Sequence, residues 1–143
     1  MNNVEEKTGR GIVIIDNNLV TIKRTKVKDK KEKIYYTIPG GHVEENENYE
    51  ETIIREIFEE LGISVKVNEE FLHIYNEDLN REEAFYNCEY ISGNIGTGTG
   101  PEWGEYHEEY GKYDIELINI NDISEYNILP IEVKNKLIKE YSN

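Results

Sequence analysis

PGGHVEENENYEETIIREIFEELGISV, residues 39–65 of the chain, joins a glycine turn to an acidic helix. Asn48, followed three residues later by Glu51, matches a capping box, which predicts a helix that begins at Tyr49. Gly62 predicts the end of that helix, because glycine readily adopts the left-handed conformation of a helix stop. The stretch therefore predicts a short helix entered through a tight bend.

The two sides of this helix differ in character when residues are placed at about 100° per position. One side is apolar and is expected to pack on a sheet through Tyr49, Ile53, Ile54, Ile57, Phe58 and Leu61. Beside it lie Glu56, Glu59 and Glu60, whose like charges repel one another at this spacing. A bound divalent cation would remove the repulsion, since Mg²⁺ and Mn²⁺ prefer oxygen ligands. A plain solvated acidic face is the alternative in a chain this rich in glutamate.

The full spacing of the stretch resembles the Nudix box of the Nudix hydrolases. Every specified position of that motif is matched, by Gly41, Glu47, Arg55, Glu56, Ile57, Glu59, Glu60, Gly62 and Ile63. The resemblance implies an α/β fold, a Nudix-type α/β/α sandwich with a mixed sheet, in which the box forms a loop-helix-loop catalytic motif. It also implies that residues 1–143 form a single Nudix hydrolase domain.

The resemblance further implies an activity and roles for these residues. Nudix hydrolases use Mg²⁺ or Mn²⁺ and water to cleave the diphosphate bond of nucleoside diphosphate derivatives, by attack on phosphorus. The implied metal ligands are the backbone carbonyl of Gly40 and the side chains of Glu56, Glu59 and Glu60. Arg55 and Glu59 are the implied catalytic residues, Arg55 by orienting a carboxylate. Gly41, Glu47 and Gly62 are implied to have structural roles in the motif.

Residues outside the motif carry weaker signals. Some Nudix hydrolases supply the catalytic base from a later loop, for which Glu102 is the candidate here, although ordinary loop charge is an equal alternative. Trp103, Tyr86 and Tyr106 are candidates for stacking on a substrate base, although aromatic residues in such positions often serve packing. No signature commits the chain to one substrate; oxidised or ordinary nucleoside triphosphates are the first expectation.

The rest of the chain predicts a mixture of strands and helices. Alternating or β-branched runs predict strands over residues 11–15, 19–24, 34–38, 63–67, 71–75, 84–91 and 113–120. The basic run 26–33 is expected to be an exposed loop, and residues 92–112 a long loop. Pro130 is expected to open a C-terminal helix that packs through Ile131, Val133, Leu137, Ile138 and Tyr141.

Composition limits the classes of partner. The 143 residues include 30 acidic and 16 basic side chains, for a net charge of −14. This balance argues against a nucleic-acid polymer or an anionic membrane as partner, because either needs a basic face. A small nucleotide substrate remains compatible when metal ions bridge the charges. The single cysteine, Cys88, excludes an internal disulfide, and with no apolar run of membrane-spanning length we expect a cytoplasmic protein.

Two alternatives to an enzyme follow from the same residues. A catalytically silent Nudix-like module would bind a nucleotide or an ADP-ribose derivative, but it would be expected to lack one of Glu56, Glu59 or Glu60. An acidic interaction protein would use the helix to bind a basic partner, but it would not need Gly41, Arg55 and Gly62 at this spacing. The resemblance also allows a homodimer, as is common among Nudix proteins.

Overall fold

The computed structural model describes residues 6–99 and 103–141. These divide into two compact units. The first unit comprises Met1–Ile14 and Pro39–Thr99, and the second comprises Ile15–Ile38 and Gly100–Asn143. Within the described residues, no helix is both long enough and apolar enough to cross a membrane.

The first unit contains a mixed sheet and one helix. Its elements are β1 (Glu6–Ile15), β4 (Gly40–His42), α1 (Tyr49–Leu61), β5 (Ile63–Asn76) and β6 (Arg81–Gly93). β1 is parallel to β6 on one side and antiparallel to β4 on the other, while β5 is antiparallel to β6. This arrangement confirms the predicted α/β class with a mixed sheet.

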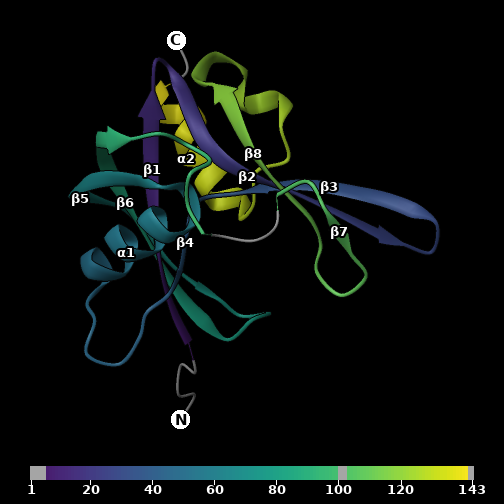
Figure 1. Cartoon of the computed structure of the whole chain (residues 1–143), viewed down its shortest axis with the longest axis horizontal. Helices are drawn as coiled ribbons and strands as arrows, with labels where there is room; N and C mark the ends of the chain where they lie inside the picture. The colour runs from purple at the N-terminus through teal and green to yellow at the C-terminus, as the bar shows by residue number, and fades with distance from the viewer. Residues whose placement is uncertain (1–5, 100–102, 142–143) are drawn as a thin grey trace. The chain divides into compact units, whose positions relative to one another are not determined.

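The helix α1 packs where β1 has no side chains. A Cβ added to Gly11 would lie 2.6 Å from Ile57 Cδ1 and 3.1 Å from Ile53 Cγ2, so these two isoleucines occupy the space above the strand. Ile53 and Ile57 are fully buried, as is Leu61 one turn further on. Figure 1 shows α1 lying beside this part of the first unit.

The predicted apolar face of α1 is too wide. Ile54 and Phe58 are 44% and 57% exposed, so the expectation that they pack on the sheet is wrong. The row of residues spaced by four, through Ile53 and Ile57, already fills the surface that the glycines of β1 offer. The neighbouring row therefore faces outward.

The second unit contains an antiparallel sheet with two short helical elements. Its elements are β2 (Asn18–Lys28), β3 (Lys31–Thr37), β7 (Tyr106–His107), β8 (Gly111–Asn119), the 3₁₀ helix η1 (Ile120–Glu125) and α2 (Ile131–Tyr141). The strand order is β3-β2-β8-β7, and Figure 1 shows β2 and β3 as a long hairpin. The C-terminal helix predicted after Pro130 is confirmed, but Ile131 is 49% exposed, whereas Val133 and Leu137 are buried.

Three predicted loops or breaks differ from the structure. Residues 26–33 form the end of the β2–β3 hairpin instead of a loop, because Asp29 and Lys30 both adopt positive φ angles (52° and 64°) that suit a two-residue turn. The strands predicted at 63–67 and 71–75 are one strand, β5, with pairing irregularities between them. The long loop 92–112 contains β7 and the start of β8.

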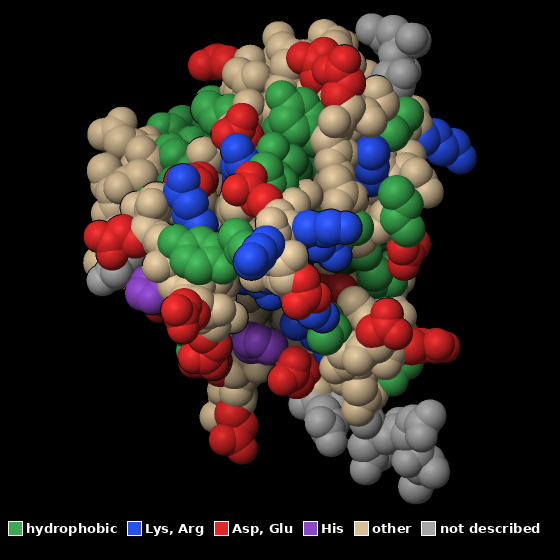
Figure 2. Space-filling model, turned by 90° about the vertical axis from the view of Figure 1, so that its right-hand side faces the viewer, with side chains coloured by type: hydrophobic (Ala, Val, Ile, Leu, Met, Phe, Trp, Pro, Cys, Tyr) green, Lys and Arg blue, Asp and Glu red, His purple; other side chains and the backbone are tan. Residues whose placement is uncertain are grey.

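Charge is mixed on the surface despite the net excess of acid. Figure 2 shows both basic (Lys, Arg) and acidic (Asp, Glu) side chains on the face that it draws. The net charge of −14 is therefore not spread as a uniformly acidic surface.

Candidate active site in the first unit

The glycine turn brings β4 into close contact with both β1 and α1. A Cβ on Gly40 would lie 2.1 Å from the carbonyl oxygen of Gly9, and the φ angle of Gly40 is +152°. A Cβ on Gly41 would lie 2.5 Å from the carboxyl carbon of Glu56. Only glycine fits at either position, and the second one forms a cradle for a carboxylate of α1.

The backbone pairing also indicates where the carbonyl group of Gly40 points. The N–H of Val43 donates to the oxygen of Lys7 (2.8 Å), and the N–H of Gly11 donates to the oxygen of Pro39 (2.9 Å). Hydrogen-bonded pairs alternate along antiparallel strands, so Gly40 occupies a position that is not bonded to β1. Its carbonyl is thus directed away from β1, as a ligand group requires.

Both predicted ends of α1 are confirmed. The Asn48 side chain accepts a hydrogen bond from the Glu51 N–H (2.8 Å), and the Glu51 carboxylate accepts one from the Asn48 N–H (3.0 Å). Gly62 ends the helix in the left-handed conformation with a φ angle of 80°, and its N–H donates to the oxygen of Phe58. These local bonds fix where the acidic side chains of the helix begin and end.

Residues 96–99, which lie in the predicted long loop 92–112, form hydrogen bonds with the C-terminal end of α1. The N–H of Gly96 donates to the oxygen of Leu61 (3.0 Å), and the N–H of Thr99 donates to the oxygen of Glu59 (2.7 Å). Gly98 lies so close that an added Cβ would be 2.5 Å from the oxygen of Glu59. The segment thereby satisfies carbonyls that a helix end leaves without intrahelical donors.

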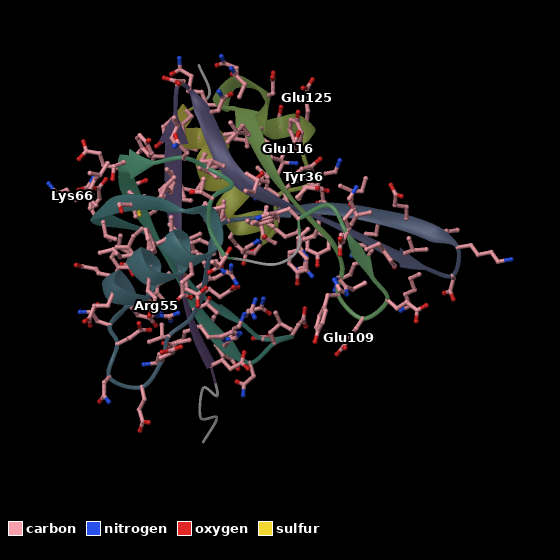
Figure 3. All side chains as sticks on the ribbon, viewed as in Figure 1. Tyr36, Arg55, Lys66, Glu109, Glu116 and Glu125 are labelled. Carbon is pink, nitrogen blue, oxygen red and sulfur yellow. The ribbon has the colours of Figure 1, made fainter. Side chains whose placement is uncertain are left out.

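Arg55, which Figure 3 labels, connects the loop before α1 to the acidic side of the helix. Its guanidinium donates to both carboxylate oxygens of Glu47 (2.7 and 2.9 Å), to Glu56 (2.9 Å) and to Glu59 (3.3 Å). Hydrogen bonding from Arg55 lowers the pKa of Glu47 to about 2, and hydrogen bonding to Glu47 raises the pKa of Arg55. A bidentate pair of this kind holds both side chains in one geometry.

Glu56 and Glu60 form a carboxyl pair beside the turn. Burial, together with the hydrogen bond and charge of Glu56, raises the pKa of Glu60 to about 8. A like charge nearby disfavours the ionised form of a carboxyl group, and a bound cation offsets this effect. Their oxygen donors and mutual repulsion fit a hard divalent ion such as Mg²⁺ or Mn²⁺.

Glu59, the third predicted metal ligand, is turned toward Arg55 and its side chain is 52% exposed. Among residues 6–99 and 103–141, no group of three or more acidic, His or Cys side chains converges into a ready-made metal site. The structure thus brings together Glu56 and Glu60 but leaves Glu59 in the ion pair with Arg55.

Charged residues that the sequence reasoning missed lie on β1 and β6 of the same unit. Arg10 Nε and Arg81 Nη2 are 3.5 and 3.2 Å from the same oxygen of Glu83, whose side chain is only 3% exposed. Burial lowers the pKa of Arg10, and the charges of Glu83 and Glu60 act in the opposite direction. The signal available in the sequence was an arginine directly before the apolar run 11–15 of β1.

The predicted substrate-binding residues lie in both units. Tyr86 is half-buried on β6 of the first unit, with its ring 6.4 Å from that of Tyr49. In the second unit, Tyr106 is 46% exposed and its hydroxyl accepts a hydrogen bond from the N–H of Val27. Trp103 is half-buried in the same unit, and Glu102 lies outside the described residues. The binding roles of these residues stay predictions.

Cys88 lies on β6, within the strand that the sequence predicts over residues 84–91. Burial raises the pKa of its thiol to about 12. The neutral thiol is a poor nucleophile and a poor metal ligand.

Residues 6–108 match the model of the NUDIX domain family, and this match covers well over half of the chain. This chain belongs to the Nudix hydrolase family. The match includes the complete turn-helix motif and confirms the predicted Nudix-type fold class and enzyme class.

Individual relatives of this Nudix hydrolase show how far the similarity extends. An ADP-ribose pyrophosphatase of Methanocaldococcus jannaschii is 44% identical over 57 residues, which is 40% of this chain and 32% of that protein. The chain thus matches only about a third of that relative's length.

Two solved structures share the Nudix fold along nearly the whole chain. A MutT structure from work on Aliivibrio salmonicida and Vibrio cholerae has a TM-score of 0.66 and 21% identity, covering 94% of this chain and 97% of that one. An ADP-ribose pyrophosphatase of Streptococcus suis has a TM-score of 0.66 and 10% identity, covering 96% and 92%. At these sequence identities the two structures show only that the fold is shared.

Proposed function

We propose that this Nudix hydrolase is a Mg²⁺- or Mn²⁺-dependent pyrophosphohydrolase that cleaves the diphosphate bond of a nucleoside diphosphate derivative. The observation that carries the proposal is the cradle at Gly41, which holds the Glu56 carboxylate beside Glu60 at the start of the motif. All the available ligand atoms are oxygens, and the Gly40 carbonyl is directed away from β1, so both features support a divalent ion at this place.

The proposed roles follow from the contacts of each residue. Glu56, Glu60 and the Gly40 carbonyl would hold the ions, which when bound supply charge neutralisation at the pyrophosphate. Arg55 orients Glu56 and Glu59 through its fixed pairing with Glu47. Glu59, being half exposed, is able to take a proton from the attacking water, with Glu102 as the alternative base.

ADP-ribose is the first substrate to test. The relative that is 44% identical over 57 residues is named an ADP-ribose pyrophosphatase, and its matched segment covers 40% of this chain. Nucleoside triphosphates form the second class, since the chain carries no signature that excludes them.

We further propose a cytoplasmic location, because the single cysteine of the chain cannot form an internal disulfide. Assembly as a homodimer stays a prediction.

The experiment measures products by mass after incubation with ADP-ribose, nucleotide sugars and nucleoside triphosphates, with Mg²⁺ or Mn²⁺ and with EDTA. We expect metal-dependent release of a nucleoside monophosphate from at least one compound. Glu60→Gln should lower turnover by about 100-fold or more and weaken Mn²⁺ binding measured by calorimetry. Glu89→Gln makes the same change at an exposed position of β6 and serves as the control. Near-normal activity of Glu60→Gln would reject the assigned role.

One observation favours a second function, a silent module that binds nucleotide without hydrolysing it. Arg55 engages both Glu56 and Glu59, so a metal ion has to compete with the guanidinium for these carboxylates. The same panel separates the two functions. Nucleotide binding by calorimetry without any cleaved compound would support the silent module, and cleavage would support the enzyme.

A further inference from the structure

The last turn of α1 is held from outside by residues 96–99, which follow β6 in the chain and are called the brace below. The N–H at the start of the brace, on Gly96, donates to the oxygen of Leu61 (3.0 Å). The N–H at its end, on Thr99, donates to the oxygen of Glu59 (2.7 Å). Carbonyls in the last turn of a helix lack intrahelical donors, so the brace supplies bonds that the helix cannot make for itself.

Two glycines let the backbone of the brace touch the backbone of the helix. A Cβ on Gly98 would lie 2.5 Å from the oxygen of Glu59 and 2.6 Å from the carbonyl carbon of Glu60. In the other direction, a Cβ on Gly62 would lie 2.7 Å from the nitrogen of Gly98 and 2.8 Å from the carbonyl carbon of Thr97. These distances are too short for a real Cβ atom, so a side chain at either glycine would displace the brace or the helix end.

The contact gives Gly62 a second task besides ending the helix. Its φ angle of 80° is left-handed, a conformation that asparagine also adopts at helix ends. The helix stop alone therefore does not require glycine. The approach of the brace does, because any Cβ at this position would meet backbone atoms.

The brace acts through its backbone rather than through its side chains. The Thr97 hydroxyl and N–H both turn back to the oxygen of Asn94 (2.7 and 3.3 Å), which closes a compact turn. The side chain of Thr99 is exposed, whereas its N–H is bonded to the helix. The segment can therefore be altered at its backbone and at its side chains separately.

The two ends of the acidic row on α1 are thus positioned by different parts of the first unit. Glu56 lies against Gly41 and is held by Arg55. Glu59 and Glu60 extend from the turn whose backbone the brace holds. A movement of that turn would shift Glu60 relative to Glu56, and displacements of about 1 Å in an active site can cost about 100-fold in rate.

We propose that Gly98 and Thr99 are positioning residues, which set the places of Glu59 and Glu60 through the backbone of the last turn of α1. The functional consequence rests on the proposed function, because it takes Glu60 as a metal ligand and Glu59 as a base. Groups that orient metal ligands without touching the metal typically contribute about 10- to 100-fold to metal affinity or activity.

The test is calorimetric titration of the full chain with Mn²⁺ in the absence of substrate. Gly98→Ala inserts a methyl group between the brace and the helix, and Thr99→Pro removes the N–H that Glu59 accepts. Each should raise the dissociation constant for Mn²⁺ about 10- to 100-fold at unchanged stoichiometry. A partly unfolded sample would instead lower the stoichiometry. If Gly98→Ala does not fold, Thr99→Pro carries the test.

Two control variants separate positioning from loss of stability. Thr99→Ala keeps the N–H and removes only an exposed side chain, so its Mn²⁺ affinity should match the wild type. Val133→Ala opens the buried side of α2 in the second unit, so it should lower Tm without changing Mn²⁺ affinity. With the best substrate of the panel and saturating Mn²⁺, Gly98→Ala and Thr99→Pro should lower kcat and kcat/KM together, with KM within about threefold.

Mn²⁺ affinities of Gly98→Ala and Thr99→Pro that match those of the controls would overturn the positioning role, as would wild-type protein that binds no Mn²⁺. The panel of substrates is scored separately on wild-type protein. Cleavage by the wild type with unchanged Mn²⁺ affinity in both variants rejects the brace alone. Weakened Mn²⁺ binding in both variants, without any cleavage by the wild type, supports the brace and rejects the proposed hydrolysis.

Discussion

Arg55 is the residue on which the geometry of the acidic helix depends. It contacts the carboxylates of Glu44, Glu47, Glu56 and Glu59, so it ties the turn before α1 to the side chains proposed to act on substrate. Its planar fork pairs with both oxygens of Glu47 while a third nitrogen reaches the helix. A lysine has one compact charge and cannot make these contacts together.

The first prediction concerns this fork. Arg55→Lys should reduce kcat about 10- to 100-fold, because the carboxylates lose the orientation that the fork provides. Steady-state kinetics on the best substrate of the panel measures the effect. Lys66→Arg, the reverse change at an exposed position, is the control. A kcat that matches the control would contradict the orienting role.

The second prediction concerns acid. The pKa of Glu47 is lowered from 4.5 to about 2, so the ionised form is favoured in the folded state. Its contribution to stability is fully present above pH 4.5 and is lost as the pH falls toward 2. In Glu47→Gln, Tm should be lower at neutral pH and should fall less steeply between pH 4.5 and 2 than in the wild type. Parallel curves of Tm against pH would remove Glu47 from this role.

At the scale of the element, α1 shows that helix periodicity alone does not say which apolar residues are buried. Ile53 and Ile57 lie over the glycines of β1, and Ile54 and Phe58 do not. Sequence spacing defines a broad apolar face, whereas the area of sheet beneath it decides how much of that face is covered.

The third prediction compares two isoleucines of this helix. Ile57→Ala should lower the free energy of unfolding by about 2–5 kcal/mol, since Ile57 is fully buried. Ile54→Ala should change it by about 0.5 kcal/mol or less, because Ile54 is 44% exposed. Urea denaturation followed by circular dichroism measures both. Equal losses would mean that Ile54 is covered in solution.

At the scale of the whole molecule, neither compact unit is a continuous piece of chain. The boundaries fall after Ile14, after Ile38 and after Thr99, so the chain passes between the units three times. β1 begins in one unit and ends at its boundary with the other. This connectivity couples the units through the backbone, although it does not by itself test the predicted single domain.

The fourth prediction is that both units unfold together. Differential scanning calorimetry should give one transition with equal calorimetric and van't Hoff enthalpies, as small single domains do. Mn²⁺ should raise Tm if it binds only the folded state. Two resolved transitions would contradict the single-domain prediction.

The turn-helix motif could be predicted from the sequence because its determinants are local. The capping pair Asn48 and Glu51 and the stop at Gly62 act over three or four residues, and the structure has them where they were predicted. The family could be recognised for the same reason, from the spacing of Gly41, Arg55 and the glutamates.

Other features depended on the tertiary structure because they join residues far apart in the chain. The cluster of Arg10, Arg81 and Glu83 exists only because β1 and β6 lie side by side. The donors of Gly96 and Thr99 reach the end of α1 from beyond β6. Local sequence sets caps and turns through short-range hydrogen bonds, but which distant charges meet, and which apolar side chains are covered, is decided when the strands pair.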